Sequence, residues 1–305
     1  MISRAADVLT KSRKRLLSTA AAPAVAATVV LGALEALNLH AQTQADGPRF
    51  DTASITLNAS GDSRGGCCGI QPGGQVTATN VTLRQLIQSA YQRHPFDDRE
   101  ISGGPSWIDT VRFDVVAKAP RDPVFDADGS APELWAMLRT LLGDQFKLKI
   151  RTESMERPIY ALVMANSDGA LGPRIRRSDA DCGAVMASMI KGDPPTKPTC
   201  ATALYPGRLV VSALPMSAVA SLLSKSVDRV VVNRTGLKGR FDIELEAVEI
   251  RPQGPFGPSY RPSDTKQSIF ASVAEQLGLE LKATTGPVES LVVDHAEQPT
   301  DGSRH

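Results

Sequence analysis

The sequence predicts an α+β fold made by internal duplication. The order of apolar, glycine and charged positions over residues 74–163 recurs over residues 207–293. In each half, apolar residues recur first at the three- and four-residue spacing of a helix and then at the two-residue spacing of a strand. Stretches rich in glycine and proline separate these patterns. Together these observations predict four helix–strand–strand units, with helices packed on mixed or antiparallel sheets.

The repeat is clearest in short matched segments. Gly74 begins a segment that lines up with the one beginning at Gly207, and the tripeptide Arg-Phe-Asp at 112–114 recurs at 240–242. The offset is shorter for the second match than for the first, because the first half has a longer loop around His94. The halves differ mainly in their loops, so a binding site is expected in the loops and not in the repeated scaffold.

The chain is expected to divide into five segments. They are a signal peptide or membrane anchor (1–41), the first α+β half (46–165), a disulfide-pinned connection (166–206), the second α+β half (207–297) and a polar tail (298–305).

The first unit of the first half follows a predicted strand. Ile55 and Leu57 alternate with polar residues in this strand, and the Gly/Ser-rich stretch 59–74 is expected to be a loop. Thr82 is a suitable N-cap for a helix with one apolar face. Alternating apolar residues over 111–115 then predict another strand.

The second unit of each half is expected to be a helix followed by a β-hairpin. In the first half, strands through Ile150 and Ile159 should pair across a turn near 156–158, after a helix that ends at Gly143. The second half should repeat this hairpin after a helix that ends at Gly278. One such unit is too small to fold alone, so the units must share cores.

The N-terminal segment has the order of a secretory signal. Basic residues at 11–15 precede an apolar run from Leu16 to Leu34, and Ala41 is a suitable last residue before cleavage. The apolar run is also close to the length that spans a bilayer, so an anchor in the inner membrane is the alternative. Either interpretation places the rest of the chain in the periplasm, at the cell surface or outside the cell.

The composition beyond this segment argues against a nucleic-acid partner. Residues 1–41 hold five of the 34 basic residues and two of the 33 acidic ones, so the remainder is slightly acidic. Without a basic field, no attraction to nucleic acid is expected.

Four cysteines give two pairs with different expectations. Cys182 and Cys200 flank a loop rich in proline and glycine, whose closure is worth about 3 kcal/mol by chain entropy, so they are the expected disulfide. Cys67 and Cys68 are neighbours, with Cα atoms about 3.8 Å apart, which is below the usual disulfide range. Two thiols are the simpler expectation for them, and a redox-active bond is the alternative.

No pattern in the sequence predicts catalysis. The nucleophile elbow, the His-Glu-x-x-His motif, the P-loop and the Gly-x-Gly-x-x-Gly loop are absent. His94 lies near Asp97 and Glu100 but lacks the spacing of metal ligands, which favours a solvated loop. Asp114 and Asp242 are related by the repeat and could form a glycosidase pair, although carboxylates in such positions are usually solvated. No catalytic, cofactor-binding or metal-binding residue is therefore predicted.

Several motifs together resemble a secreted, soil-associated family of bacterial proteins of unknown function. They are Phe50–Ile55, the Gly-Gly-Pro-x-Trp turn at 103–107, and the segments 112–114, 235–242 and 275–279. The resemblance covers about residues 49–300 and implies an exported protein. Some members resemble extensions of membrane-embedded antibiotic-sensor metallopeptidases. The peptidase motif is absent here, so the resemblance supplies no catalytic residue.

The sequence thus predicts an exported, non-catalytic module of the periplasm or cell surface that binds an unidentified envelope protein or surface ligand. A membrane-tethered sensor ectodomain is one alternative, held by the segment from Leu16 to Leu34. A carboxylate-dependent hydrolase that uses Asp114 and Asp242, or His94, is the other.

Overall fold

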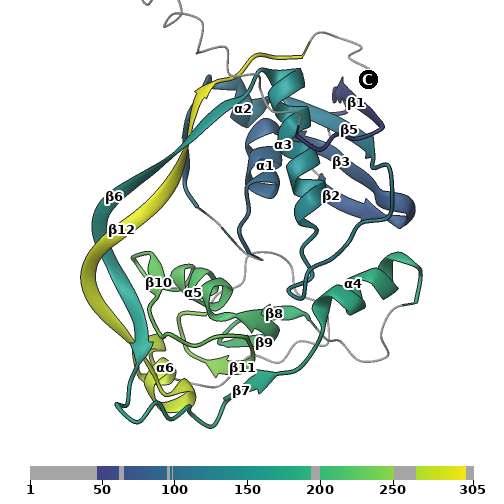
Figure 1. Cartoon of the computed structure of the whole chain (residues 1–305). Coiled ribbons are helices and arrows are strands. Elements are labelled where there is room, and N and C mark those ends of the chain that lie inside the picture. Colours follow the sequence, from purple (N-terminus) through teal and green to yellow (C-terminus); the bar gives the residue numbers. More distant parts are fainter. Residues whose placement is uncertain are drawn as a thin grey trace, which may run out of the picture. The chain divides into compact units, whose positions relative to one another are not determined.

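The computed structural model describes residues 47–61, 65–94, 97, 99–193, 200–250 and 266–299. Helices and strands alternate over these residues in an α+β fold, which confirms the predicted class (Figure 1). The segment from Leu16 to Leu34 and the expected cleavage site at Ala41 lie outside the described residues. Among the described helices, none has the length and apolarity needed to cross a membrane.

The first repeat builds the first sheet and three helices. Its elements are β1 (Thr52–Leu57), β2 (Gly66–Gln71), β3 (Gln75–Thr82), α1 (Leu83–Ala90), β4 (Ile101–Gly103), α2 (Trp107–Thr110), β5 (Arg112–Lys118), α3 (Pro132–Phe146) and β6 (Lys149–Met164). Four antiparallel strands pair in the order β1-β5-β3-β2. As predicted, α1 begins after the cap Thr82, whose hydroxyl accepts a hydrogen bond from the Gln85 N–H while the Gln85 side chain accepts one from the Thr82 N–H.

The second repeat has the same strand order. Its elements are β7 (Ile175–Ser178), α4 (Cys182–Ile190), β8 (Thr202–Tyr205), β9 (Arg208–Pro215), α5 (Met216–Ser224), β10 (Val231–Asn233), β11 (Arg240–Glu246), α6 (Ile269–Leu277) and β12 (Leu279–His295). The sheet runs β7-β11-β9-β8, so each strand has a counterpart in the first sheet. The segment 166–206, expected to be a simple connection, therefore supplies both edge strands of this sheet and α4.

The two predicted β-hairpins are wrong, because β6 and β12 pair with each other instead. The two long strands form an antiparallel ribbon (Figure 1). In this ribbon Leu162 lies opposite Leu281, and Ile150 lies opposite Val293. The chain stays extended through 156–158, where a turn was expected. At Pro158 the ribbon has only two strands, so each strand has one edge without a partner. Proline, which has no N–H, is tolerated at such an edge.

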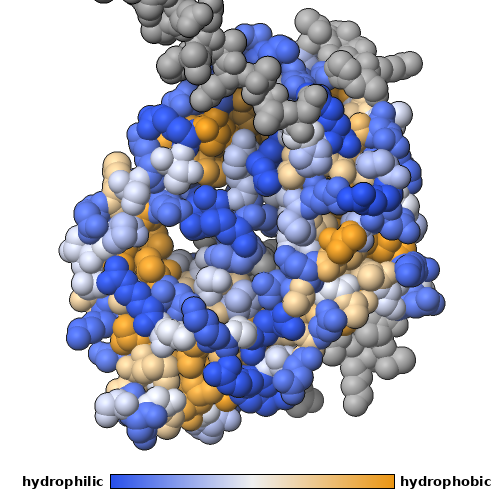
Figure 2. Space-filling view, in the orientation of Figure 1, coloured by the Kyte–Doolittle hydropathy of each residue, from blue (hydrophilic) through white to orange (hydrophobic). Residues whose placement is uncertain are grey.

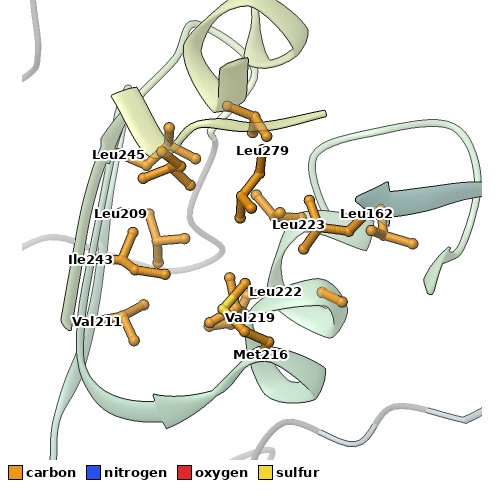
Figure 3. Packing of buried hydrophobic residues seen from close by; sticks show 14 of the residues in the cluster. Leu162, Leu209, Val211, Met216, Val219, Leu222, Leu223, Ile243, Leu245 and Leu279 are labelled. Carbon is orange, nitrogen blue, oxygen red and sulfur yellow. The ribbon is translucent and has the colours of Figure 1, made fainter. Parts of the chain in front are cut away.

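The C-terminal end of each long strand packs in the core of the other repeat. Leu162, near the end of β6, is buried in the second-repeat core with residues of β9, α5, β11 and β12 (Figure 3). Leu291 and Val293, near the end of β12, are buried in the first-repeat core. A short parallel strand also pairs at each end, β10 with residues 160–162 and β4 with residues 291–293. The two repeats therefore exchange strand ends.

The predicted ends of two helices and one predicted loop can also be compared with the structure. Helix α6 ends as predicted at Gly278, which has a positive φ of 68°. Helix α3 instead continues through Gly143, and Lys147 takes the left-handed conformation. Phe146 is consequently a buried helical residue, in contact with the Phe113 ring, and not part of a strand. The Gly/Ser-rich stretch 59–74 contains strand β2 and is not only a loop.

Candidate binding groove

The middle of the ribbon forms the floor of a groove of about 860 Å³. Arg157, Pro287 and Val288 contribute to this floor. One wall is formed by a loop of the first repeat through Arg93, His94, Asp97, Arg99 and Glu100. The other is formed by helix α5 with the segment 225–233. Figure 2 shows a hollow near the centre of this face, bordered by hydrophilic side chains. A volume of this order is typical of sites for small ligands.

Equivalent corners of the two repeats meet in this groove. The N–H of Leu291 donates to the carbonyl of Glu100 (2.8 Å), and the N–H of Tyr160 donates to the carbonyl of Val230 (3.0 Å). These bonds make Glu100 and Val230 counterparts at the starts of β4 and β10. The dipeptide Asp-Arg precedes both residues in the sequence, at 98–99 and 228–229. The groove therefore lies where the same part of each repeat faces the other.

The corner of the first repeat is organised by the buried carboxylate of Asp97. It accepts hydrogen bonds from the N–H of Arg93 (2.8 Å) and from Nε of Arg99 (3.1 Å), and the Arg99 guanidinium also donates to the Tyr91 carbonyl. Burial raises the pKa of Asp97, but the Arg93 N–H and the nearby arginine charges outweigh it and hold the pKa below its usual value. The charged carboxylate thus fixes the loop that forms this wall.

Ion pairs join this wall to the floor. Arg93 pairs with Glu289 (2.6 Å), and Glu100 pairs with Arg157 (2.8 Å). The described residues of the lining include five basic and four acidic side chains, so the groove is close to electrically balanced. Such a lining suits a small ligand with polar groups better than a polyanion.

The corner of the second repeat is more open. Its carboxylate, Asp228, is 73% exposed, and the ion pair with Arg229 is long at 3.8 Å. The Tyr160 hydroxyl donates to Asp228 (3.1 Å), and the Arg229 guanidinium lies over the Tyr160 ring at 5.2 Å from its centroid. Asp228 is therefore accessible to a ligand, whereas Asp97 is held by its own loop.

A polar face of α5 lines the second wall. Ser217, Ser221 and Ser224 lie on one side of the helix, at the spacing that places residues on a common face. The hydroxyl of Ser224 accepts a hydrogen bond from the N–H of Val231 (2.9 Å) and donates to the carbonyl of Ala220 (3.0 Å). The opposite side of the helix is buried in the second-repeat core through Met216, Val219, Leu222 and Leu223.

The repeat-related aspartates are structural. Asp114 accepts a hydrogen bond from the N–H of Asn80 (2.8 Å), and Asp242 accepts one from the N–H of Ala213 (2.9 Å) and pairs with Arg176 (2.7 Å). Asn80 and Ala213 both have positive φ, 55° and 58°, at irregular points of the strand pairing. Each carboxylate thus holds a β-bulge in its own sheet. Neither residue is part of the groove lining.

The remaining predicted site residues lie in different places. His94 is part of the groove lining, beside Asp97. The described residues contain no group of three or more side chains arranged to hold a metal ion. Cys182 is bonded to Cys200, with Cα atoms 5.6 Å apart. Cys67 and Cys68 are also bonded to each other, where two thiols were the simpler expectation.

The disulfide between Cys182 and Cys200 lies where the second repeat touches the first. The N–H of Cys182, the first residue of α4, donates to the carbonyl of Ala127 in the first repeat (3.3 Å). Nearby, Arg240 of the second repeat pairs with Asp128 of the first (3.2 Å). Disulfides are typical of proteins outside the cytoplasm.

Sequence reasoning missed most of the groove. It directed attention to the loop around His94 but gave no role to the serine face of α5 or to the ribbon residues Arg157 and Glu289. Arg93 and Glu289 are far apart in the sequence, and only the pairing of β6 with β12 brings them together. A residue-by-residue comparison of the repeats could have shown that Ser217 stands at the place of Arg84.

The comparisons with known proteins give a family but no function. The sequence model of a family described as a protein of unknown function (DUF3738) matches residues 84–296. The matched region includes both corners, the ribbon and the serine face of α5. No curated protein and no solved structure matches the chain significantly.

Proposed function

We propose that this chain, which belongs to the DUF3738 family of unknown function, is an exported, non-catalytic binding module. Its ligand lies in the groove between the repeats. The observation that carries this proposal is the meeting of equivalent corners of both repeats on one polar groove. A ligand there touches both repeats and the ribbon that connects their cores.

The absence of catalysis is inferred from how the charged groups are used. The acidic side chains of the groove pair with arginines of the same groove, as in Arg93 with Glu289 and Glu100 with Arg157. Asp114 and Asp242 are occupied with β-bulges, which removes the main argument for a hydrolase. The described residues of the groove therefore offer recognition groups, and among them no arrangement is typical of acid–base catalysis.

Export is supported by the two disulfides and by the N-terminal pattern of basic residues, apolar run and Ala41. We propose that residues 46–305 act in the periplasm, at the cell surface or outside the cell. A reporter enzyme that is active only after export, fused after residue 305, tests this. Activity is expected, and an inactive reporter would contradict export.

The N-terminal sequence of the mature protein distinguishes a free module from a membrane-tethered sensor. A new N-terminus after Ala41 is expected for the free module. An intact N-terminus on protein from the membrane fraction would contradict the free module and support the tethered sensor.

Binding in the groove is tested by screening the full chain against short peptides and oligosaccharides by thermal shift. For a compound that binds, Ser221→Trp should abolish the shift because it fills the groove. Ser167→Trp, on an exposed turn residue outside the groove lining, is the matched control and should retain the shift. Equal binding by both variants would place the site elsewhere. Chemical conversion of the bound compound would contradict the non-catalytic assignment.

A further inference from the structure

The first repeat contains an arginine that the second lacks. Thr82 and Pro215 are the residues before the first turns of α1 and α5, so Arg84 and Ser217 are both second residues of equivalent helices. The carbonyls of Glu100 and Val230 accept equivalent bonds from the ribbon. The next residues in each chain segment, Ile101 and Val231, are therefore also counterparts.

In the first repeat the Arg84 guanidinium covers the edge of β4. It donates to the carbonyl of Ile101 and to both carboxylate oxygens of Asp109, one of them at 2.9 Å. Asp109 lies in the short helix α2, between β4 and β5. This planar, two-pronged contact is the geometry in which a guanidinium recognises a carboxylate.

In the second repeat the counterpart carbonyl, that of Val231, lacks such a side-chain donor among the described residues. Ser217 is too short to reach the strand edge, and no helical turn lies between β10 and β11. Within the described part of the chain, the carbonyl of Val231 has no hydrogen-bond donor, although its N–H is bonded to Ser224. Ser217 and Val231 both line the groove. The groove is thus lined by the counterpart of the backbone acceptor that Arg84 uses in the first repeat.

We infer that the groove binds an extended peptide segment of a partner whose arginine side chain takes the place that Arg84 occupies in the first repeat. This inference rests on the proposed function, since it names the ligand class of the same groove. The guanidinium donates to the carbonyl of Val231. Asp228, an exposed carboxylate of the same lining whose ion pair with Arg229 is long, takes the part of Asp109.

The rest of the lining fits a peptide. Apolar groups of the groove lie next to this place, and they offer contacts to the flanking side chains of an extended segment: Val227, Val230, Val232 and Val288. No tryptophan, tyrosine or phenylalanine is among the described lining residues, and these are the rings on which the apolar face of a sugar would stack. A peptide therefore fits the groove better than an oligosaccharide.

The test uses the full chain with both disulfides and a neutral-flanked probe peptide, acetyl-Ala-Val-Arg-Val-Ala-amide. Isothermal titration should show binding of this peptide. The same peptide with citrulline in place of arginine should bind at least about tenfold more weakly, because citrulline keeps the shape and loses the charge. Equal affinity for both peptides would overturn the inference.

Two variants test where the arginine of the probe peptide binds. Ser217→Arg supplies the missing guanidinium from the chain itself, so it should block the probe and weaken its binding at least about tenfold. Ser167→Arg adds the same charge at an exposed turn residue outside the groove lining and should leave binding unchanged. Asp228→Asn changes an exposed side chain, so it should fold normally and should also weaken binding of the arginine peptide. Unchanged binding by Asp228→Asn and by a folded Ser217→Arg would overturn the inference.

Failure of this inference is distinguishable from failure of the proposed function. If no arginine peptide binds but another compound does, and Ser221→Trp blocks that compound, the groove is a binding site and only the peptide assignment is wrong. If a compound binds equally well to Ser221→Trp, both are wrong.

Discussion

The exchange of strand ends predicts that a mutation in one repeat destabilises the other. Leu162 belongs to the first repeat by sequence, yet it is fully buried in the second-repeat core. Truncation of a buried leucine costs about 2–5 kcal/mol, from lost burial and from the cavity that remains. The free energy of unfolding of an ordinary domain is about 5–15 kcal/mol, so Leu162→Ala should remove a large part of this stability.

Hydrogen exchange measured by mass spectrometry tests where this cost appears. Leu162→Ala should accelerate exchange in β9 and β11 of the second sheet before it affects β3 and β5 of the first. The mirror variant is Leu291→Ala, at a position 3% exposed in the first-repeat core, and it should loosen β3 and β5 instead. Glu280→Ala, at an exposed position of β12, is the control and should change neither sheet.

The opposite pattern would refute the strand exchange. If Leu162→Ala loosened β3 and β5 first, β6 would be folding back on its own repeat as the hairpin that the sequence suggested. Equal loosening of both sheets by both variants would also contradict the reasoning, since the two cores would then not be separable.

Three further predictions concern single groups. Asp114→Ala leaves the N–H of Asn80 without its acceptor and should cost about 1–3 kcal/mol in denaturant unfolding; an unchanged midpoint would contradict the bulge role. The pKa of Asp97 is lowered in the folded state, so its contribution to stability is present above the unfolded value of about 3.9 and is lost as the pH falls through the folded value. The stability gap between wild type and Asp97→Asn should therefore be large at pH 7 and shrink below about pH 4, and a constant gap would show that Asp97 is not charged in the fold. Replacing Cys182 and Cys200 together by serine should cost about 3 kcal/mol and accelerate exchange in α4, and unchanged exchange there would mean that the disulfide does not hold this helix.

The sequence was sufficient where the determinant is local. The helix after Thr82 was predicted from a cap and an apolar face, and both are present because they depend on neighbours a few residues away. Gly278 ends α6 for the same reason, since a left-handed residue is a local requirement. The α+β class followed from the two periodicities.

The partners of the long strands could not be predicted in this way. Alternation of apolar residues indicates that Ile150, Ile159 and Leu281 lie in strands, but it is identical whether a strand pairs with its neighbour or with a distant copy of itself. Because the two repeats contain similar strands, each long strand has two possible partners: a neighbouring segment of its own repeat or the matching strand of the other repeat. In the pairing observed, both ends of both strands contact a core: one end of each strand packs in the first-repeat core and the other in the second-repeat core. The groove depends on that pairing, so it could not be read from the sequence either.

The duplication also supports the proposed position of the binding site in this groove. Two copies of one unit have the same strand order, and the bulges at Asp114 and Asp242 show how closely the scaffold is kept. The copies differ at one backbone acceptor: Arg84 donates to the carbonyl of Ile101 in β4, whereas the short Ser217 leaves the carbonyl of Val231 in β10 without such a donor among the described residues. A scaffold that is the same in both halves can tolerate such a difference, because the core that carries stability is separate from the surface that changes. Under the proposed function, the first repeat therefore indicates what the second repeat would bind.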